Sequence, residues 1–188
     1  MLDPETTKRE LEPVLDWCSA ALVYGVQQAA RFFSALPLDR ELFCHIVRYW
    51  VRLIVRDGDL LKLDELPNTG MELAYGRYRI RVWNGPDGEL PGPGASLRLR
   101  DFYRQPYLLE PDASEPVRLA ILWEANMKQG ELVGIWLVCP RSAENLQDVH
   151  WRISLPVPVL PAAAVTNEPV DDDLPLALRD DDSAALKG

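Results

Sequence analysis

The spacing of the apolar residues changes once along this chain, and the change restricts the folds that the chain can adopt. Between residues 3 and 56 the apolar side chains recur every three or four positions, which is the period of an α-helix. Between residues 71 and 155 they alternate, which is the period of a β-strand with one buried face. Because the helices precede the strands instead of alternating with them, the pattern predicts an α+β fold.

Two helical segments are predicted in the first part of the chain. Asp3 and Pro4 form a helix start, because an aspartate side chain caps the first turn and proline fits the first helical position. Pro37 ends this segment, and Asp39 caps a second helix over residues 40–56. The core stripe predicted for the second helix consists of Leu42, Ile46, Trp50, Leu53 and Ile54.

Five strands are predicted in the second part of the chain, with short turns between most of them. They are expected at residues 72–83, 96–103, 117–125, 131–139 and 149–155. Short connections favour an antiparallel β-meander, with the N-terminal helices packed on one face of the sheet. Trp50 on the second helix and Trp151 on the last strand are expected to be core residues.

The charge distribution separates a body from a tail. Residues 1–160 are expected to form a single α+β domain, with a helical part over 3–66 and a β part over 71–156. The whole chain has a net charge of −9, and residues 161–188 contribute −5 of it through seven acids and two bases. This composition offers too little apolar surface to offset chain ordering, so residues 161–188 are predicted to form a disordered acidic tail.

The cysteines and the apolar runs indicate the compartment. Cys18, Cys44 and Cys139 are odd in number and far apart, which argues against a disulfide framework and favours the cytoplasm. No apolar run is long enough to span a bilayer, so no membrane association is expected.

Cys44 lies beside His45, but a tetrahedral metal site needs about four ligands, and adjacent helical residues point in different directions. We therefore expect no metal, and no motif indicates a cofactor.

Five arginines form the most specific pattern in the sequence. The segment RYRIRVW has arginine at every second position, and the segment RLR repeats that spacing. If both segments are strands of one hairpin, their arginines share one face: Arg77, Arg79, Arg81, Arg98 and Arg100. Opposed like charges weaken a sheet, so an anion is expected beside them. Glu72, Glu124, Glu131 or solvent could supply the negative charge. Because guanidinium groups match carboxylate and phosphate geometry, the face is also predicted to bind an anionic ligand or a protein partner.

Two alternatives remain open. The same arginine face would serve a nucleic-acid-binding protein, together with a basic stripe of Arg48, Arg52 and Arg56 on the second helix, although the net negative charge disfavours this. A thiol enzyme using Cys139 and His150 has the weakest support, because strand parity puts these two side chains on opposite faces unless a β-bulge brings them together. Cys139 is expected to share the buried face with Val133, Ile135 and Leu137, opposite Trp151, Ile153 and Leu155.

The sequence therefore favours binding over catalysis, and no catalytic residue is predicted. We expect a non-enzymatic binding protein of the adaptor, chaperone-like or antitoxin and immunity type. Its partner surface would be the arginine-lined face of the sheet.

Overall fold

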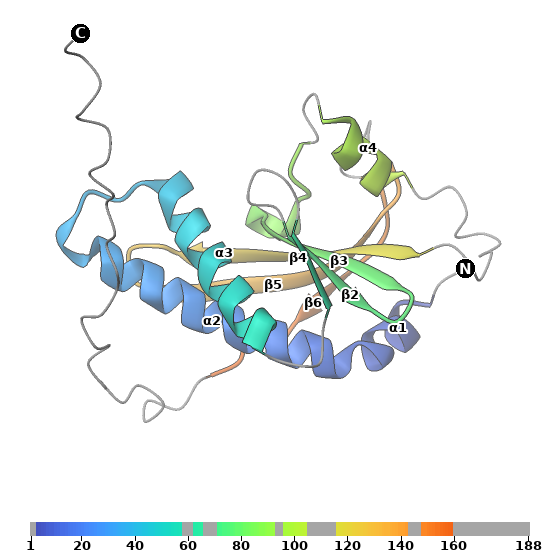
Figure 1. The fold of residues 1–188 in the computed structure, drawn as a ribbon, viewed down its shortest axis with the longest axis horizontal. Coiled ribbons are helices and arrows are strands. Elements are labelled where there is room, and N and C mark those ends of the chain that lie inside the picture. The colour runs from blue at the N-terminus through green and yellow to red at the C-terminus, as the bar shows by residue number, and fades with distance from the viewer. Residues whose placement is uncertain are drawn as a thin grey trace, which may run out of the picture.

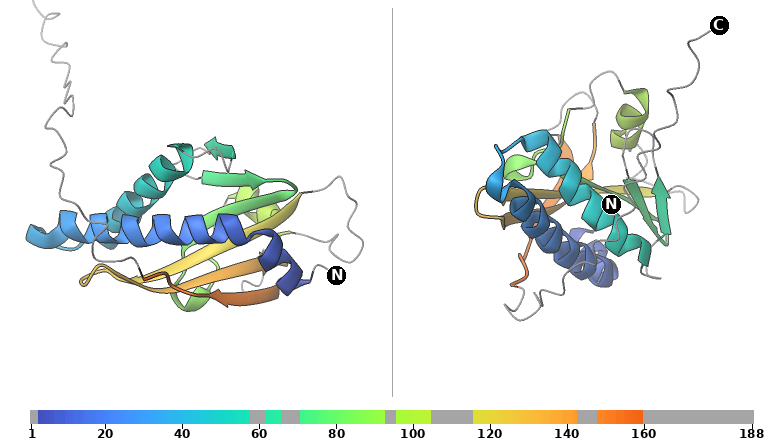
Figure 2. Two further views of the ribbon diagram at one scale, coloured as in Figure 1. Left: turned by 90° about the horizontal axis from the view of Figure 1, so that it is seen from below. Right: turned by 60° about the vertical axis from the view of Figure 1, so that its left-hand side comes forward.

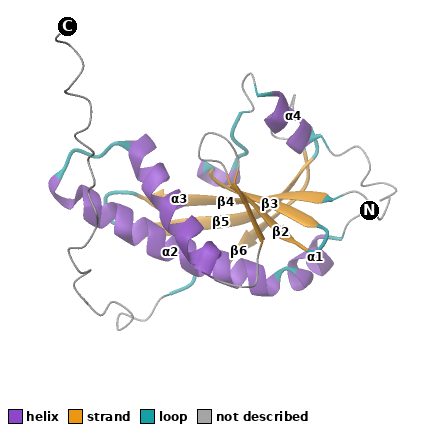
Figure 3. Cartoon of the chain, viewed as in Figure 1, coloured by secondary structure: helices purple, strands orange, loops and turns teal. Residues whose placement is uncertain are grey.

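The computed structural model of the chain describes residues 3–57, 62–65, 71–92, 96–104, 116–142 and 148–159. Its helices are α1 (Pro4–Glu10), α2 (Glu12–Phe32), α3 (Arg40–Asp57) and α4 (Leu97–Tyr103), with short 3₁₀ turns η1 (Phe33–Ala35) and η2 (Pro86–Gly88). Its strands are β1 (Lys62–Glu65), β2 (Met71–Tyr75), β3 (Tyr78–Asn84), β4 (Val117–Asn126), β5 (Glu131–Pro140) and β6 (Val149–Leu155). The predicted α+β class is confirmed (Figures 1 and 3). The predicted tail, residues 161–188, lies outside the described residues.

The sheet is mixed, and this corrects the predicted five-stranded antiparallel meander. Six strands follow one another in the order β1-β2-β3-β4-β5-β6. Four of the five pairings are antiparallel, but β3 pairs with β4 in parallel. A parallel pair needs a long connection to bring the chain back to the same end of the sheet, and residues 85–116 provide it. Strand β1 was not predicted.

Two of the five predicted strands are wrong in detail. Residues 72–83 are a hairpin rather than one strand, because Gly76 takes a positive φ of 53° and turns the chain between β2 and β3. Residues 96–103 contain the helix α4 instead of a strand. The side chain of Ser96 accepts a hydrogen bond from the Leu99 amide at 3.3 Å, which caps this helix at its first turn.

Helices α2 and α3 cover one face of the sheet, and α4 lies on the other (Figures 1 and 2). The main core forms between α2, α3 and the inward residues of the strands, among them Leu73, Ile80 and Leu119. A second, smaller core lies under α4. Its buried members are Leu90, Phe102, Tyr103, Ala120, Leu122 and Val138.

The helix starts were predicted well, but the buried face of α3 was not. Asp3 accepts a hydrogen bond from the Thr6 amide, and Asp39 accepts one from the Leu42 amide, so both predicted caps are present. The buried stripe of α3 consists of Phe43, Val47, Val51 and Val55, each 0% exposed. Leu42 of the predicted stripe is 43% exposed, and Trp50 is only partly buried. The predicted facing is therefore wrong by about one residue, or about 100° around the helix.

The predicted facing of the last two strands is confirmed. Cys139 pairs with Trp151, Leu137 with Ile153 and Ile135 with Leu155, and the three β5 residues are buried. Two expectations on the same face fail. Val133 is exposed, since a register shift lies next to it in the β4–β5 pairing, and Trp151 is only partly buried because β6 is an edge strand.

Candidate functional site

The predicted arginine face is divided between three places. Arg77 lies in the β2–β3 turn, and its guanidinium contacts the Glu10 carboxylate at 3.5 Å and stacks over the Tyr78 ring at 5.2 Å. The Tyr78 hydroxyl also donates to Glu10, so these three residues join α1 to the hairpin. Arg77 therefore makes structural contacts away from the face that it was predicted to share.

Arg81 and its neighbour Glu72 form a partly buried ion pair on the α4 side of the sheet. Arg81 is only 7% exposed, and its Nε donates to Glu72 Oε2 at 2.9 Å. The two residues are direct cross-strand partners. The Phe102 ring of α4 covers the guanidinium, with its centroid 4.2 Å from Cζ. Glu72 was among the acids expected to neutralise this face, and for Arg81 it does so.

Arg79 lies on the same face as Arg81, two residues earlier on β3, and its environment is different. Its register partner on β4 is Arg118, and its partner on β2 is Ala74, which in turn pairs with Lys62 on β1. We call these three basic residues, Lys62, Arg79 and Arg118, the cationic row. Arg79 Nη1 donates to the carbonyl oxygens of Gly76 and Tyr78, and Arg79 forms no ion pair with any described residue.

Arg118 also connects the cationic row to α4. Its Nη1 donates to the carbonyl oxygens of Asp101 and Arg104 at the C-terminal end of that helix, where a positive charge is favourable. Arg98 and Arg100 are exposed residues of α4 and do not belong to a hairpin strand. The structure thus keeps Arg79 and Arg81 on one face, and it replaces the predicted Arg98 and Arg100 with Lys62 and Arg118.

The thiols are placed in apolar surroundings. Burial raises the pKa of the Cys18 thiol to about 12 and also raises the pKa of the half-buried Cys44, so both resist forming a thiolate at neutral pH. Cys139 is 0% exposed, and its register partner is Trp151. The register shifts between Cys139 and Pro140, which pairs with Val149, so His150 has no register partner on β5. Within the described part of the chain, no group of three or more His, Cys, Asp or Glu side chains is placed to hold a metal ion.

The predicted basic stripe of α3 is present on one side of that helix. Arg52 and Arg56 line a shallow hollow of about 210 Å³ together with Tyr49, Leu53 and Leu63 of β1. Arg48 is partly buried, and its burial lowers the pKa of its guanidinium. The stripe and the cationic row belong to different layers, since α3 covers the sheet face opposite to Arg79.

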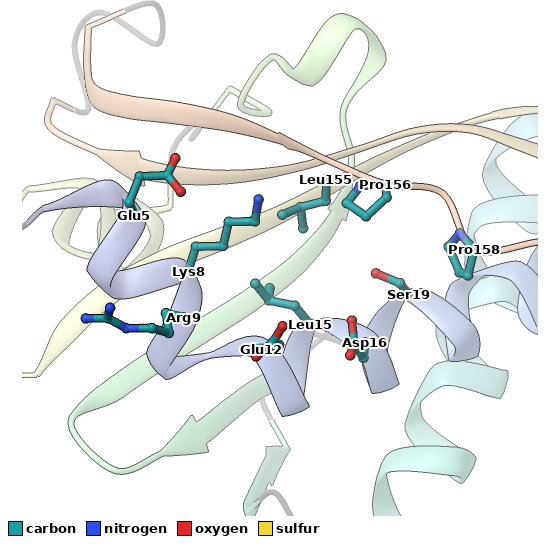
Figure 4. Close-up of a pocket in the computed structure, with 10 residues that line it drawn as sticks. All are labelled: Glu5, Lys8, Arg9, Glu12, Leu15, Asp16, Ser19, Leu155, Pro156 and Pro158. Atoms are coloured by element: carbon teal, nitrogen blue, oxygen red, sulfur yellow. The ribbon is translucent and has the colours of Figure 1, made fainter.

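A groove lies between the N-terminal helices and the end of β6 (Figure 4). Its volume is about 490 Å³, which is within the usual range for ligand sites. Leu15 of α2 and Leu155, Pro156 and Pro158 give it an apolar lining. Charged side chains of α1 and α2 line its helical side: Glu5, Lys8, Arg9, Glu12 and Asp16.

Neither the place of Arg118 beside Arg79 nor the groove was predicted from the sequence. The segment VRLAIL has Arg118 at an outward position of a predicted strand, so its facing was available, but its place beside Arg79 depends on the parallel pairing. Glu12, Asp16 and Ser19 form a polar stripe at helical spacing in the largely apolar first half of α2, and this stripe was a usable signal for the groove.

No family model, curated protein or solved structure matches this chain. Across the ranges that the structure describes, no helix combines the length and the apolar character needed to cross a bilayer.

Proposed function

We propose that this chain is a non-enzymatic binding protein that holds an acidic segment of a partner protein on its cationic row. The observation that carries the proposal is the placement of Arg79. This arginine is partly exposed, lies directly across from a second arginine, and has only backbone carbonyls as hydrogen-bond acceptors among the described residues. Carboxylates of a partner would relieve the repulsion between the paired arginines and accept hydrogen bonds from the guanidinium.

The neighbouring residues support a binding surface over a purely structural cluster. Two residues further along β3, Arg81 forms an ion pair with Glu72 and lies against the Phe102 ring. Its charge is therefore neutralised within the protein. In the row of Arg79 the adjacent β2 residue is Ala74, which has no charge to offer. Of the two β3 arginines on the α4 side of the sheet, Arg81 is therefore neutralised within the protein and Arg79 can bind a partner.

A protein partner is favoured over nucleic acid because the chain as a whole is acidic, with a net charge of −9. Nonspecific attraction of a polyanion weakens as the net negative charge of the protein grows. A row of three basic residues matches a short run of carboxylates better than a long phosphate backbone, which is usually bound by many more contacts.

The test compares Arg79→Glu with the unaltered chain in binding a labelled ten-residue polyglutamate peptide. We expect a loss of affinity of about tenfold or more at low salt, which corresponds to about 1.4 kcal/mol. Binding should also weaken between low and physiological salt, since exposed charge pairs are screened. Fluorescence anisotropy measures both effects.

The matched control is Arg31→Glu, which makes the same charge change at an exposed position in the last turn of α2. Equal affinities of the two variants would contradict the proposal, because net charge alone would then explain the binding. Tighter binding of a single-stranded oligonucleotide than of the peptide, lost in Arg79→Glu, would instead favour a nucleic-acid partner.

A further inference from the structure

We propose that the groove between α1–α2 and the end of β6 is a second, separate binding site for an extended segment of a partner protein. The segment would pair with the outer edge of β6. It would place an apolar side chain on Leu15 and Leu155, and a Lys or Arg side chain beside Glu12 and Asp16. With the cationic row on the other face of the sheet, the protein would then hold two chains of opposite charge.

The apolar part of the groove has a lining of leucine and proline, which suits an aliphatic side chain. Leu15 lies on α2 and Leu155 at the end of β6, so the two leucines face the groove from different layers (Figure 4). Pro156 and Pro158 continue the wall beyond β6. Neither proline has a backbone N–H, so strand pairing cannot extend past Leu155, and this fixes where a bound segment would have to end.

The two acids at the α2 end of the groove favour a cationic side chain there, whereas the basic residues of the lining, Lys8 and Arg9, lie on α1. Glu12 and Asp16 are exposed, lie one helical turn apart on α2, and form no ion pair with any described residue. Like charges at this spacing repel each other, and a Lys or Arg between them would remove the repulsion. Lys8 extends toward Leu155 instead, so the cationic side chain is expected at the Glu12 and Asp16 end (Figure 4).

Ser19 adds a polar group to the lining of the groove. This residue is 6% exposed, and its hydroxyl has no hydrogen-bond partner among the described residues. Figure 4 shows the hydroxyl directed into the space between α2 and Pro156. Because it lines the groove, this hydroxyl is placed to form a hydrogen bond with a polar group there. A backbone carbonyl or amide of a bound segment would supply it.

The outer edge of β6 would supply main-chain hydrogen bonds to the bound segment. β6 is the last strand in the sheet order, and no described strand pairs with its outer side. An exposed edge can add a further strand through main-chain hydrogen bonds, while side-chain pockets select the sequence. Alternate residues of an extended segment face the same side about 7 Å apart. The proposed recognition pattern is therefore an apolar residue and a Lys or Arg separated by one residue.

The test uses a labelled, end-blocked hexapeptide of sequence TVTKTV and the full chain. We expect it to bind the unaltered protein at least tenfold more tightly than the peptide TVTETV, in which glutamate replaces lysine. The double variant Glu12→Gln, Asp16→Asn should lose about tenfold in affinity for TVTKTV. Both positions are exposed, so the variant is expected to fold, and circular dichroism checks this.

The matched control variant is Glu41→Gln, Glu131→Gln, which removes two exposed acids outside the groove and should bind TVTKTV unchanged. A TVTKTV peptide with N-methylated valines should bind poorly, because it cannot pair with β6. Undiminished binding of that peptide, or equally tight binding of octylamine, would overturn the proposal, since strand pairing would then be unnecessary.

This inference does not rest on the proposed function, and each of the two proposals can be wrong while the other holds. The variant Arg79→Glu should bind TVTKTV as the unaltered chain does, and the groove double variant should bind polyglutamate as before. Loss of both interactions in either variant would overturn the assignment of two separate sites.

Discussion

At the scale of single residues, two arginines of β3 on the α4 side of the sheet lie in different environments. Arg81 is buried with Glu72 under Phe102, whereas Arg79 keeps its charge near solvent. A buried charge needs its counter-charge, because the attraction between the two offsets the free energy lost when the charge is removed from water. Arg81 is therefore expected to contribute to stability, and Arg79 is the residue that we propose binds a partner.

The ion pair leads to a prediction about stability. Replacing Glu72 with glutamine keeps the shape but removes the negative charge, so Arg81 is left buried without a counter-charge. We expect the free energy of unfolding to fall by about 3 kcal/mol, measured by urea denaturation. The double variant Glu72→Gln, Arg81→Met should recover most of this loss, because both charges are then gone. A single variant within about 0.5 kcal/mol of the parent would show that Phe102 and solvent are sufficient partners.

Alternation within a strand predicted part of the candidate site. It placed Arg79 and Arg81 on one face and named Glu72 among the possible counter-charges, because a period of two determines facing locally. It failed for Arg98 and Arg100, since the segment LRLRDFY is too short to separate a strand from a helix by period. Lys62 and Arg118 reach the site only through pairings between segments that are distant in sequence, and no local pattern encodes them.

At the scale of elements, α3 has two apolar stripes, and packing decides which of them is buried. Leu42, Ile46 and Trp50 form one, and Phe43, Val47, Val51 and Val55 form the other. The β-branched stripe allows a closer approach to α2. A Cβ atom built on Gly25 of α2 would lie only 3.0 Å from the carbonyl oxygen of Val47. Helix starts depend on local capping and were predicted, whereas the buried stripe depends on the neighbouring helix and was not.

Adjacent residues of α3 provide the test of this facing. Phe43→Ala should lower the free energy of unfolding by about 3–5 kcal/mol, because it leaves a cavity in the core, and Leu42→Ala should cost less than about 1 kcal/mol. Chemical denaturation of the two variants under identical conditions gives the comparison. A larger loss of stability for Leu42→Ala than for Phe43→Ala would instead support the facing predicted from the sequence.

At the scale of the whole molecule, charge is distributed unevenly between the described body and residues 161–188. The latter contain two triplets of aspartate and contribute −5 to the net charge of −9. Acidic residues on the same chain are present at a high effective concentration near a basic surface. They would therefore compete with an acidic partner for the cationic row.

This competition leads to a prediction about truncation. Deleting residues 161–188 should tighten binding of polyglutamate several-fold at low salt and much less at physiological salt, since each exposed ion pair contributes under about 1 kcal/mol and is screened. Anisotropy with the full and shortened chains measures the change. The thermal midpoint of the two chains should agree. Identical peptide affinities at low salt would contradict the competition.

The parallel pairing of β3 with β4 also determines the order in which the molecule can assemble. The β2–β3 and β4–β5 pairs form across tight turns, but β3 and β4 meet only after a connection of 32 residues has closed. Local hairpins are expected to form before such a long-range junction. Arg79 and Arg118 come from opposite sides of that junction, so their row does not exist in either hairpin alone. A partner that binds the row would recognise only chains that have completed folding, and its binding would stabilise those chains against unfolding.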